Sequence, residues 1–188
     1  MTRATATETL FLATLISLTT FFFVSGDACD KVPLMRWTDA CFKACRPPLY
    51  SVCQETLQSA PEVAEVTAYV VLAARLAKRS YDDTVGRAER LIATGAIPGD
   101  QRPAYQACID NYATARIRMV SVVTDLTGCD FTHARQEFDD AVAAMEACGK
   151  GLASGTPLVA MNNGDHDLTM VVSQLGALIL GNNNQRKM

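Results

Sequence analysis

The chain has 188 residues and a formal net charge of −3; 49% of its residues are hydrophobic and 20% are charged. This composition excludes a disordered chain and predicts one globular domain, with room for a leader segment. The acidic balance argues against nucleic acid as a partner, because phosphate binding needs a basic face.

The first predicted element is a secretory signal peptide over residues 1–26. Arg3 gives a positive start, the run from Leu10 to Val24 is almost purely apolar, and Val24-Ser25-Gly26 offers small residues for cleavage. The apolar run is shorter than the ~20 residues that a membrane-spanning helix needs. We therefore expect a secreted protein whose folded domain is 27–188, with no membrane segment after cleavage. An uncleaved membrane anchor is the alternative.

A small helical hairpin is predicted next. Apolar residues at steps of three and four indicate a helix. The first such helix is short and lies within residues 29–46. Arg46-Pro47-Pro48 ends it, because proline cannot continue a helix and restricts the residue before it. A second helix starts near Leu49. Cys45 and Cys53 flank this break and could tie the hairpin together.

The longest predicted helix follows the hairpin. Ser59 can cap it, Pro61 sits near its first turn, and Gly95 ends it. Asp100 is expected to cap the helix after that, which leads to a turn at Gly128.

The second half of the chain predicts two more helices. One carries an apolar stripe from the turn at Gly128 to Cys148. A glycine-rich connection from Gly149 to Asp165 follows, and Asp165 or the asparagines before it are expected to cap a last helix. No stretch alternates with period two for long enough to predict a strand. The fold prediction is therefore an all-α, up-and-down four-helix bundle with a short N-terminal helical hairpin.

Two cysteines are placed to form a disulfide across this bundle. Residues equidistant from the turn of an antiparallel hairpin lie side by side. Gly128 is the midpoint of Cys108 and Cys148, and each cysteine lies on the apolar face of its own predicted helix. Closing that loop would stabilise the fold by roughly 4 kcal/mol. The chain holds 7 cysteines, a number that suits a secreted protein. Because 7 is odd, at least one of them is free or pairs with another chain.

Catalytic equipment is not apparent in the sequence. It contains no glycine-rich phosphate loop, no Gly-x-Ser-x-Gly and no His-Glu-x-x-His. His133 and His166 each lie near a predicted helix start, outside any metal-binding spacing, and Cys41, Cys45 and Cys53 lack the paired spacings of a zinc site. We therefore expect no enzyme activity, no metal and no cofactor, and a protein that acts by binding another protein.

Three pieces of the chain match a known pattern. They are Cys45-Arg-Pro-Pro-Leu-Tyr-Ser-Val-Cys53 with the following Gln-Glu-Thr-Leu57, Cys108-Ile-Asp110-Asn-Tyr112-Ala-Thr-Ala115, and the helix from Phe138 to Cys148. In this order, behind a signal peptide, they resemble the plant invertase and pectin methylesterase inhibitor family. The resemblance implies a bundle clipped by Cys45–Cys53 and Cys108–Cys148, with Cys41 as the alternative partner of Cys53. It also implies a non-catalytic inhibitor, secreted to the apoplast, that docks on a carbohydrate-active enzyme of the cell wall.

The two branches of that family differ in their target. In the pectin methylesterase branch, a polar face of the bundle covers the target's substrate cleft, so that de-esterification of pectin stops. In the invertase branch, a Pro-Lys-Phe segment enters the sucrose site, and the chain has Phe131-Thr132-His133 at that position. Pectin methylesterase is therefore the first expectation, and a cell-wall or vacuolar invertase is the alternative. The expected contact residues are Asp110, Thr114 and Arg118.

Three cysteines fall outside the family framework. We expect Cys29 to pair with Cys41, and Cys129 to be free at the hairpin tip. The chain is then a monomer, unless Cys129 links two copies. From another functional class, a carrier of a small apolar ligand is the remaining alternative, although the alanine-rich inner faces leave little room for a cavity.

Overall fold

The computed structural model describes residues 29–184, so the predicted signal peptide and both ends of the predicted 27–188 domain lie outside the described residues. The elements are β1 Leu34–Arg36, α2 Trp37–Ala44, α3 Leu49–Leu57, β2 Val63–Glu65, α4 Val66–Ala93, a 3-10 turn at Gly99–Gln101, α5 Arg102–Thr127, α6 Ala134–Gly151 and α7 Pro157–Asn184.

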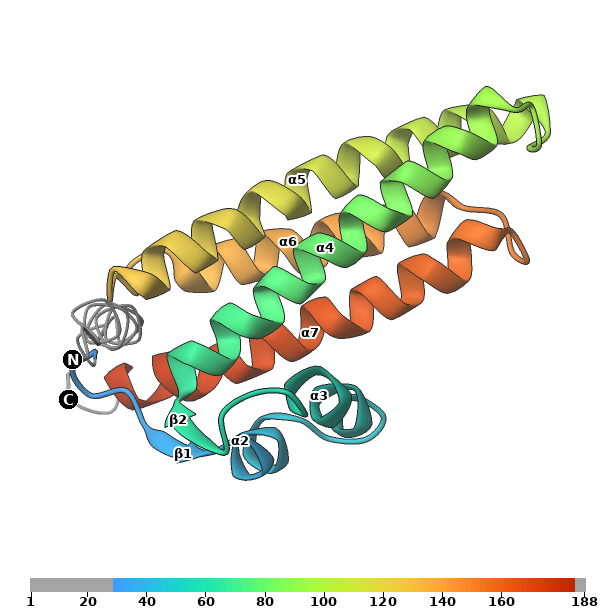
Figure 1. Cartoon of the computed structure of the whole chain (residues 1–188). Coiled ribbons are helices and arrows are strands. Elements are labelled where there is room, and N and C mark those ends of the chain that lie inside the picture. Colours follow the sequence, from blue (N-terminus) through green and yellow to red (C-terminus); the bar gives the residue numbers. More distant parts are fainter. Residues whose placement is uncertain (1–28, 185–188) are drawn as a thin grey trace, which may run out of the picture.

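The four long helices form an up-and-down bundle. Helices α4, α5, α6 and α7 follow one another around the bundle, and α7 closes it by packing against α4 (Figure 1). Short connections between successive helices produce this antiparallel order. The prediction of an all-α four-helix bundle is confirmed. Within residues 29–184, none of the helices combines the length and apolar character needed to cross a membrane.

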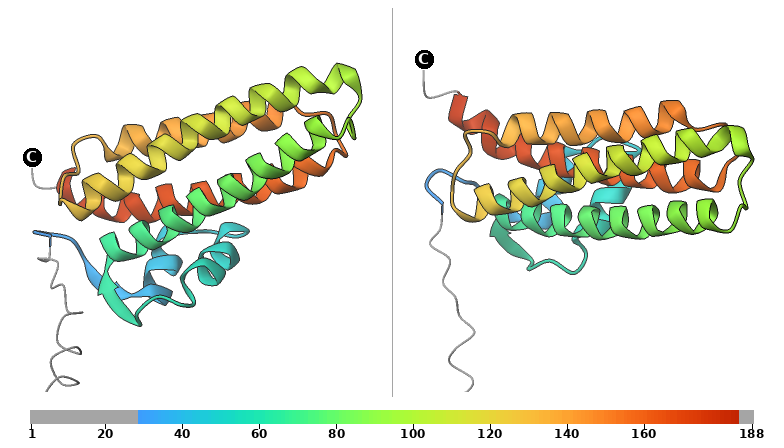
Figure 2. Two further views of the ribbon diagram at one scale, coloured as in Figure 1. Left: turned by 45° about the horizontal axis from the view of Figure 1, so that its top comes forward. Right: turned by 90° about the horizontal axis from the view of Figure 1, so that it is seen from above.

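The N-terminal hairpin lies against one side of the bundle. Helices α2 and α3 pack mainly on α7, and the two views of Figure 2 place them at the same side. The hairpin is framed by a short antiparallel sheet in which Leu34 pairs with Glu65 and Arg36 with Val63. Each strand has 3 residues, which is too short for an alternating pattern to be visible in the sequence. The prediction of no strand was therefore wrong here.

Three helix starts differ from the prediction. The chain after Ser59 bends and then forms β2 instead of a helix, so α4 begins at Val66. Helix α5 begins at Arg102, because Asp100 lies in the 3-10 turn before it. The largest difference is α7, which begins at Pro157 and runs through the asparagine- and glycine-containing segment that favoured a loop. Asp165 is therefore inside a helix and is buried.

The core combines small and large side chains. Alanines on the inner face of α4, among them Ala73, Ala74 and Ala77, are fully buried and allow the helices to approach closely. The space between the helices is filled by tyrosines, of which Tyr81 and Tyr112 meet edge to face with ring centroids 5.6 Å apart. The inner faces therefore hold alanines, as expected, together with large aromatic rings.

One close approach depends on glycine. A Cβ atom at Gly176 in α7 would overlap the ring of Phe138, which is buried on α6. We expect Gly176→Ala to lower the free energy of unfolding by about 1–3 kcal/mol, because the buried ring would have to shift within the packed core. Urea denaturation would measure this. Gly164→Ala is the matched control on the same helix, because a Cβ there meets nothing within 4 Å. Equal stability of the two variants would contradict the prediction.

The structure contains three disulfides, and one of them is the predicted Cys108–Cys148 bond, whose Cα atoms are 4.4 Å apart. The second joins Cys41 to Cys53, which was the alternative pairing, so the first expectation of Cys45–Cys53 is wrong. Cys41 lies within α2 and faces α3, whereas Cys45 lies one residue past the end of α2 in an extended conformation. Position 47 is the midpoint of 41 and 53, so the equidistance rule used for Cys108 and Cys148 would have found this pair.

The third disulfide corrects the remaining cysteine predictions. Cys29 pairs with Cys129 across 100 residues, so Cys29 does not pair with Cys41 and Cys129 is not free. A dimer link through Cys129 is excluded for this state of the chain. Cys45 is the unpaired cysteine; it is buried, and burial raises the pKa of its thiol to about 11. No local pattern could predict the pairing, because it brings together the two ends of a long stretch of chain.

Candidate docking surface

The three predicted contact residues lie on the outward side of α5. They are spaced by four residues, which places them along one side of the helix. Asp110 and Thr114 are exposed, and the Thr114 hydroxyl donates to the backbone carbonyl of Asp110 at 3.3 Å. Among the described residues, Asp110 takes part in no ion pair, so its carboxylate is available to a partner.

Arg118 has a different environment. It is half-buried, with Nη1 3.4 Å from the Glu137 carboxylate and Nη2 3.1 Å from the Asp140 carboxylate, both on α6. Its guanidinium therefore bridges two helices of the bundle, and its charge is largely balanced there. Of the three predicted residues, Asp110 presents an unpaired carboxylate, Thr114 an exposed hydroxyl that donates to its own helix, and Arg118 a guanidinium paired with α6.

The same side of α5 exposes two large apolar side chains that sequence analysis missed. Ile117 is 63% exposed and Val120 is 47% exposed. The buried positions of this part of α5 are Ala115, Met119 and Val122, which are spaced by three and four residues. Ile117 and Val120 fall between them, so the helical period of the sequence already indicates that their side chains point outward. We call the set Asp110, Thr114, Ile117 and Val120 the α5 ridge.

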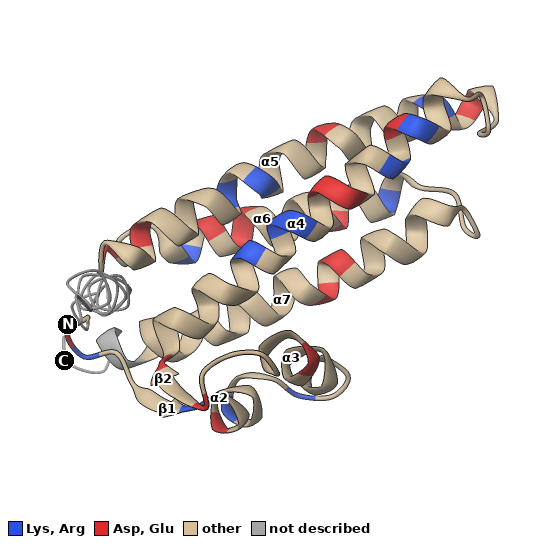
Figure 3. Ribbon diagram, in the orientation of Figure 1, with Lys and Arg blue, Asp and Glu red and all other residues tan. Residues whose placement is uncertain are grey.

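A groove between α4 and α5 runs beside the ridge. A hollow of about 120 Å³ is lined by Ala74, Arg75, Lys78, Met119, Val120, Val123 and Thr124. A second, of about 210 Å³, is lined by Tyr81, Asp82, Val85, Gly86, Glu89, Ile109, Tyr112, Ala113 and Arg116. The Asp82 carboxylate of α4 spans the groove to Arg116 of α5 at 2.8 Å, and it also contacts Lys78 of its own helix at 2.7 Å. Charged residues of both signs are interspersed along α4 and α5 (Figure 3). The ridge and the groove together form a mixed apolar and charged surface, as protein interfaces often do.

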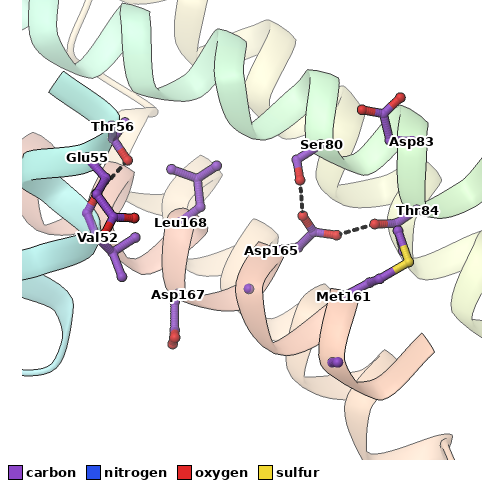
Figure 4. A pocket seen from close by; sticks show the side chains of 12 residues that line it. Val52, Glu55, Thr56, Ser80, Asp83, Thr84, Met161, Asp165, Asp167 and Leu168 are labelled. Atoms are coloured by element: carbon purple, nitrogen blue, oxygen red, sulfur yellow. Dashed lines mark hydrogen bonds between the residues drawn. The ribbon is translucent and has the colours of Figure 1, made fainter. Parts of the chain in front are cut away.

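A separate hollow of about 630 Å³ lies between α3, α4 and α7. It is lined by Val52, Glu55, Thr56, Ser80, Asp83, Thr84, Ala160, Met161, Gly164, Asp165, Asp167 and Leu168. Its carboxylates are dispersed: nowhere in the described chain do three His, Cys, Asp or Glu side chains gather in a way that could hold a metal ion. Figure 4 shows Ser80 and Thr84 of α4 directed at Asp165 of α7 at the edge of this hollow.

Asp165 is a structural centre that ties three helices together. Its carboxylate accepts hydrogen bonds from the hydroxyls of Ser80, Thr84 at 2.6 Å and Tyr112 at 2.7 Å. The Thr169 hydroxyl donates to the backbone carbonyl of Asp165 at 2.6 Å and also contacts the Tyr81 hydroxyl. Burial, and then the negative charge of Asp165, raise the pKa of Tyr112. The phenol therefore stays a hydrogen-bond donor, and the site stabilises the fold.

Comparisons with known proteins agree with this architecture. A crystal structure of a mutant form of a pectin methylesterase inhibitor from Arabidopsis matches with a TM-score of 0.65, over 77% of this chain and 97% of that chain, at 16% identity. A crystal structure of a pectin methylesterase inhibitor from Arabidopsis thaliana matches with a TM-score of 0.57, over 76% of this chain and 95% of that chain, also at 16% identity. The chain has the fold of these inhibitors. No protein-family model and no curated protein sequence matches it.

Proposed function

We propose that this protein is a secreted inhibitor that docks on pectin methylesterase and blocks its substrate cleft, which limits de-esterification of pectin in the plant cell wall. The observation that carries the proposal is the fold shared with two Arabidopsis pectin methylesterase inhibitors over 97% and 95% of their lengths. The sequence motifs at Cys108–Ala115 and Phe138–Cys148 also support it. They resemble those of the inhibitor family, and they lie on the neighbouring helices α5 and α6.

The proposed location is the apoplast. The predicted signal peptide directs the chain into the secretory pathway. Three disulfides suit the oxidising conditions that it meets there. A protein in the cell wall would encounter its target without further transport.

The proposed contact surface is the α5 ridge with the groove beside it. Ile117 and Val120 supply apolar area that a partner can cover, and removal of apolar area from water favours association. Asp110 and Thr114 lie on the same side and add polar specificity at the rim. The ridge needs no catalytic group for this role, because an inhibitor acts by covering the cleft.

Activity measurements on purified target enzymes test the proposal. Pectin methylesterase activity, followed by titration of the carboxyl groups released from pectin at mildly acidic pH, is expected to fall as the protein is added, up to an equimolar ratio. Invertase activity, measured in parallel as glucose released from sucrose, is expected to remain. Loss of invertase activity alone would establish the alternative target. Tight displacement of a fluorescent lipid, without inhibition of either enzyme, would establish an apolar-ligand carrier.

A charge placed on the ridge should weaken inhibition. We expect Ile117→Lys to raise the inhibition constant for pectin methylesterase at least ten-fold, equivalent to about 1.4 kcal/mol, because the ammonium would be buried against the partner. Phe42→Lys is the matched control: Phe42 is 76% exposed on α2, away from the ridge. Inhibition that is lost in Phe42→Lys and kept in Ile117→Lys would move the contact surface to the N-terminal hairpin.

A further inference from the structure

The three disulfides differ in their accessibility to solvent. Cys41 and Cys53 are each 0% exposed, and Cys108 and Cys148 are 1% and 2% exposed. Cys129, in contrast, is exposed on the turn between α5 and α6, and its partner Cys29 is 9% exposed at the start of the described chain. A reductant must reach a sulfur atom to attack it, so exposed disulfides are reduced before buried ones.

The two sides of the Cys29–Cys129 bond are held unequally by other contacts. The turn that carries Cys129 has its own hydrogen bonds: the Cys129 amide donates to Leu126 and the Asp130 amide to Asp125. On the other side, the Cys29 amide donates to the Glu65 carboxylate at 3.3 Å, and the Pro33 carbonyl accepts from the Val66 amide at 3.0 Å. Residues 29–32 are therefore attached by the disulfide, by the Cys29 amide and by the partly buried Val32 side chain, whereas the turn is held by hydrogen bonds of its own.

We propose that the Cys29–Cys129 bond is a redox-sensitive strap, which a dithiol reductant opens while the two buried disulfides and the helical bundle persist. One thiolate of the dithiol attacks Sγ of Cys129, a mixed disulfide forms, and Cys29 leaves as a thiolate and takes up a proton. The second thiol of the reductant then attacks the mixed disulfide and becomes part of a cyclic disulfide, and Cys129 is released as a thiol. The protein gains two electrons and two protons, and residues 29–32 detach from the end of the bundle.

The remaining free cysteine does not interfere with this switch. Cys45 is buried and lies in the N-terminal hairpin, next to the Cys41–Cys53 bond. Its thiol stays protonated at neutral pH, because burial disfavours the thiolate, and only a thiolate exchanges with disulfides. The strap therefore opens and recloses without exchanging partners, and the inference does not depend on which enzyme the protein inhibits.

Stepwise reduction tests the order of opening. The oxidised protein is incubated with dithiothreitol at neutral pH, quenched with N-ethylmaleimide at successive times, and mapped by mass spectrometry. We expect Cys29 and Cys129 to be modified at least ten-fold faster than the cysteines of the other two bonds, with unchanged helical circular dichroism. Modification of Cys41, Cys53, Cys108 or Cys148 at an equal or greater rate would overturn the proposal.

Trypsin provides a second, structural readout. Lys31 is exposed inside the strapped segment, so its peptide bond should be cleaved at least ten-fold faster after reduction. The double variant Cys29→Ser with Cys129→Ser should be cleaved at the fast rate with or without reductant. Equal cleavage rates in the oxidised and the reduced protein would show that the bond holds nothing in place. The comparison on the unmodified protein stands even if the variant fails to fold.

Discussion

Replacement of Asp165 by alanine is expected to lower the free energy of unfolding by about 3–5 kcal/mol. The carboxylate accepts hydrogen bonds from Ser80, Thr84 and Tyr112, which belong to two other helices of the bundle. A hydrogen bond to a charged group contributes about 1.5–3 kcal/mol, and the cost of burying the carboxylate offsets part of that sum. Urea denaturation followed by circular dichroism measures the difference.

Asp167→Ala is the matched control for this experiment. Asp167 lies two residues further along α7 and lines the same hollow, but it is partly exposed, and its only charged-group contact within residues 29–184 is the adjacent His166 imidazole at 3.7 Å. We expect its removal to change stability by no more than about 0.5 kcal/mol. Asp165→Asn, which keeps the shape and removes the charge, should fall between the two. A loss below about 1 kcal/mol in Asp165→Ala would show that the three hydroxyls find other acceptors.

Removal of the Cys108–Cys148 disulfide is expected to have a comparable effect. The bond closes a loop with a sequence separation of 40 residues, and the loss of loop-closure entropy in the unfolded chain is worth about 4 kcal/mol in the chain-entropy model. Both cysteines are buried, so alanine replaces them without burying a polar group. The measurement is the midpoint and slope of urea unfolding for the double alanine variant under non-reducing conditions.

The Cys41–Cys53 bond offers an internal comparison. Its sequence separation is 12 residues, for which the same model gives about 3 kcal/mol. The double alanine variant of this pair should therefore lose less stability than the variant of Cys108 and Cys148. The reverse order would show that native packing around each bond, and not the length of the closed loop, decides its contribution.

The proposed docking surface depends on a helix face that the core does not need. The inward side of α5 is occupied by Tyr112, Ala115 and Met119, and all of these are buried. Ile117 therefore points away from the core, and Val120 is covered only in part, at the edge of the groove between α4 and α5, so both leave apolar area that a partner can cover. The Ile117→Lys experiment tests this surface directly.

Much of the architecture could be predicted from local patterns. The helical stripes predicted the four helices of the bundle, and the midpoint at Gly128 placed Cys108 against Cys148. Both predictions rest on periodicity and on symmetry about a turn, which are properties of the chain itself. Asp110 and Thr114 could likewise be assigned to an outward face, because their positions fall opposite the apolar stripe.

The tertiary structure alone decided the remaining features. The Cys29–Cys129 bond can form only in the folded bundle, because α5 returns the chain to the end of the bundle at which Cys29 lies. A buried carboxylate is favourable only when hydrogen-bond donors surround it. The donors of Asp165 lie on other helices and are distant in sequence. The local sequence therefore showed only an aspartate that could cap a helix. Local sequence thus determined the helices and the two disulfides that are symmetric about a turn, whereas the long-range disulfide and the buried polar centre required the packed bundle.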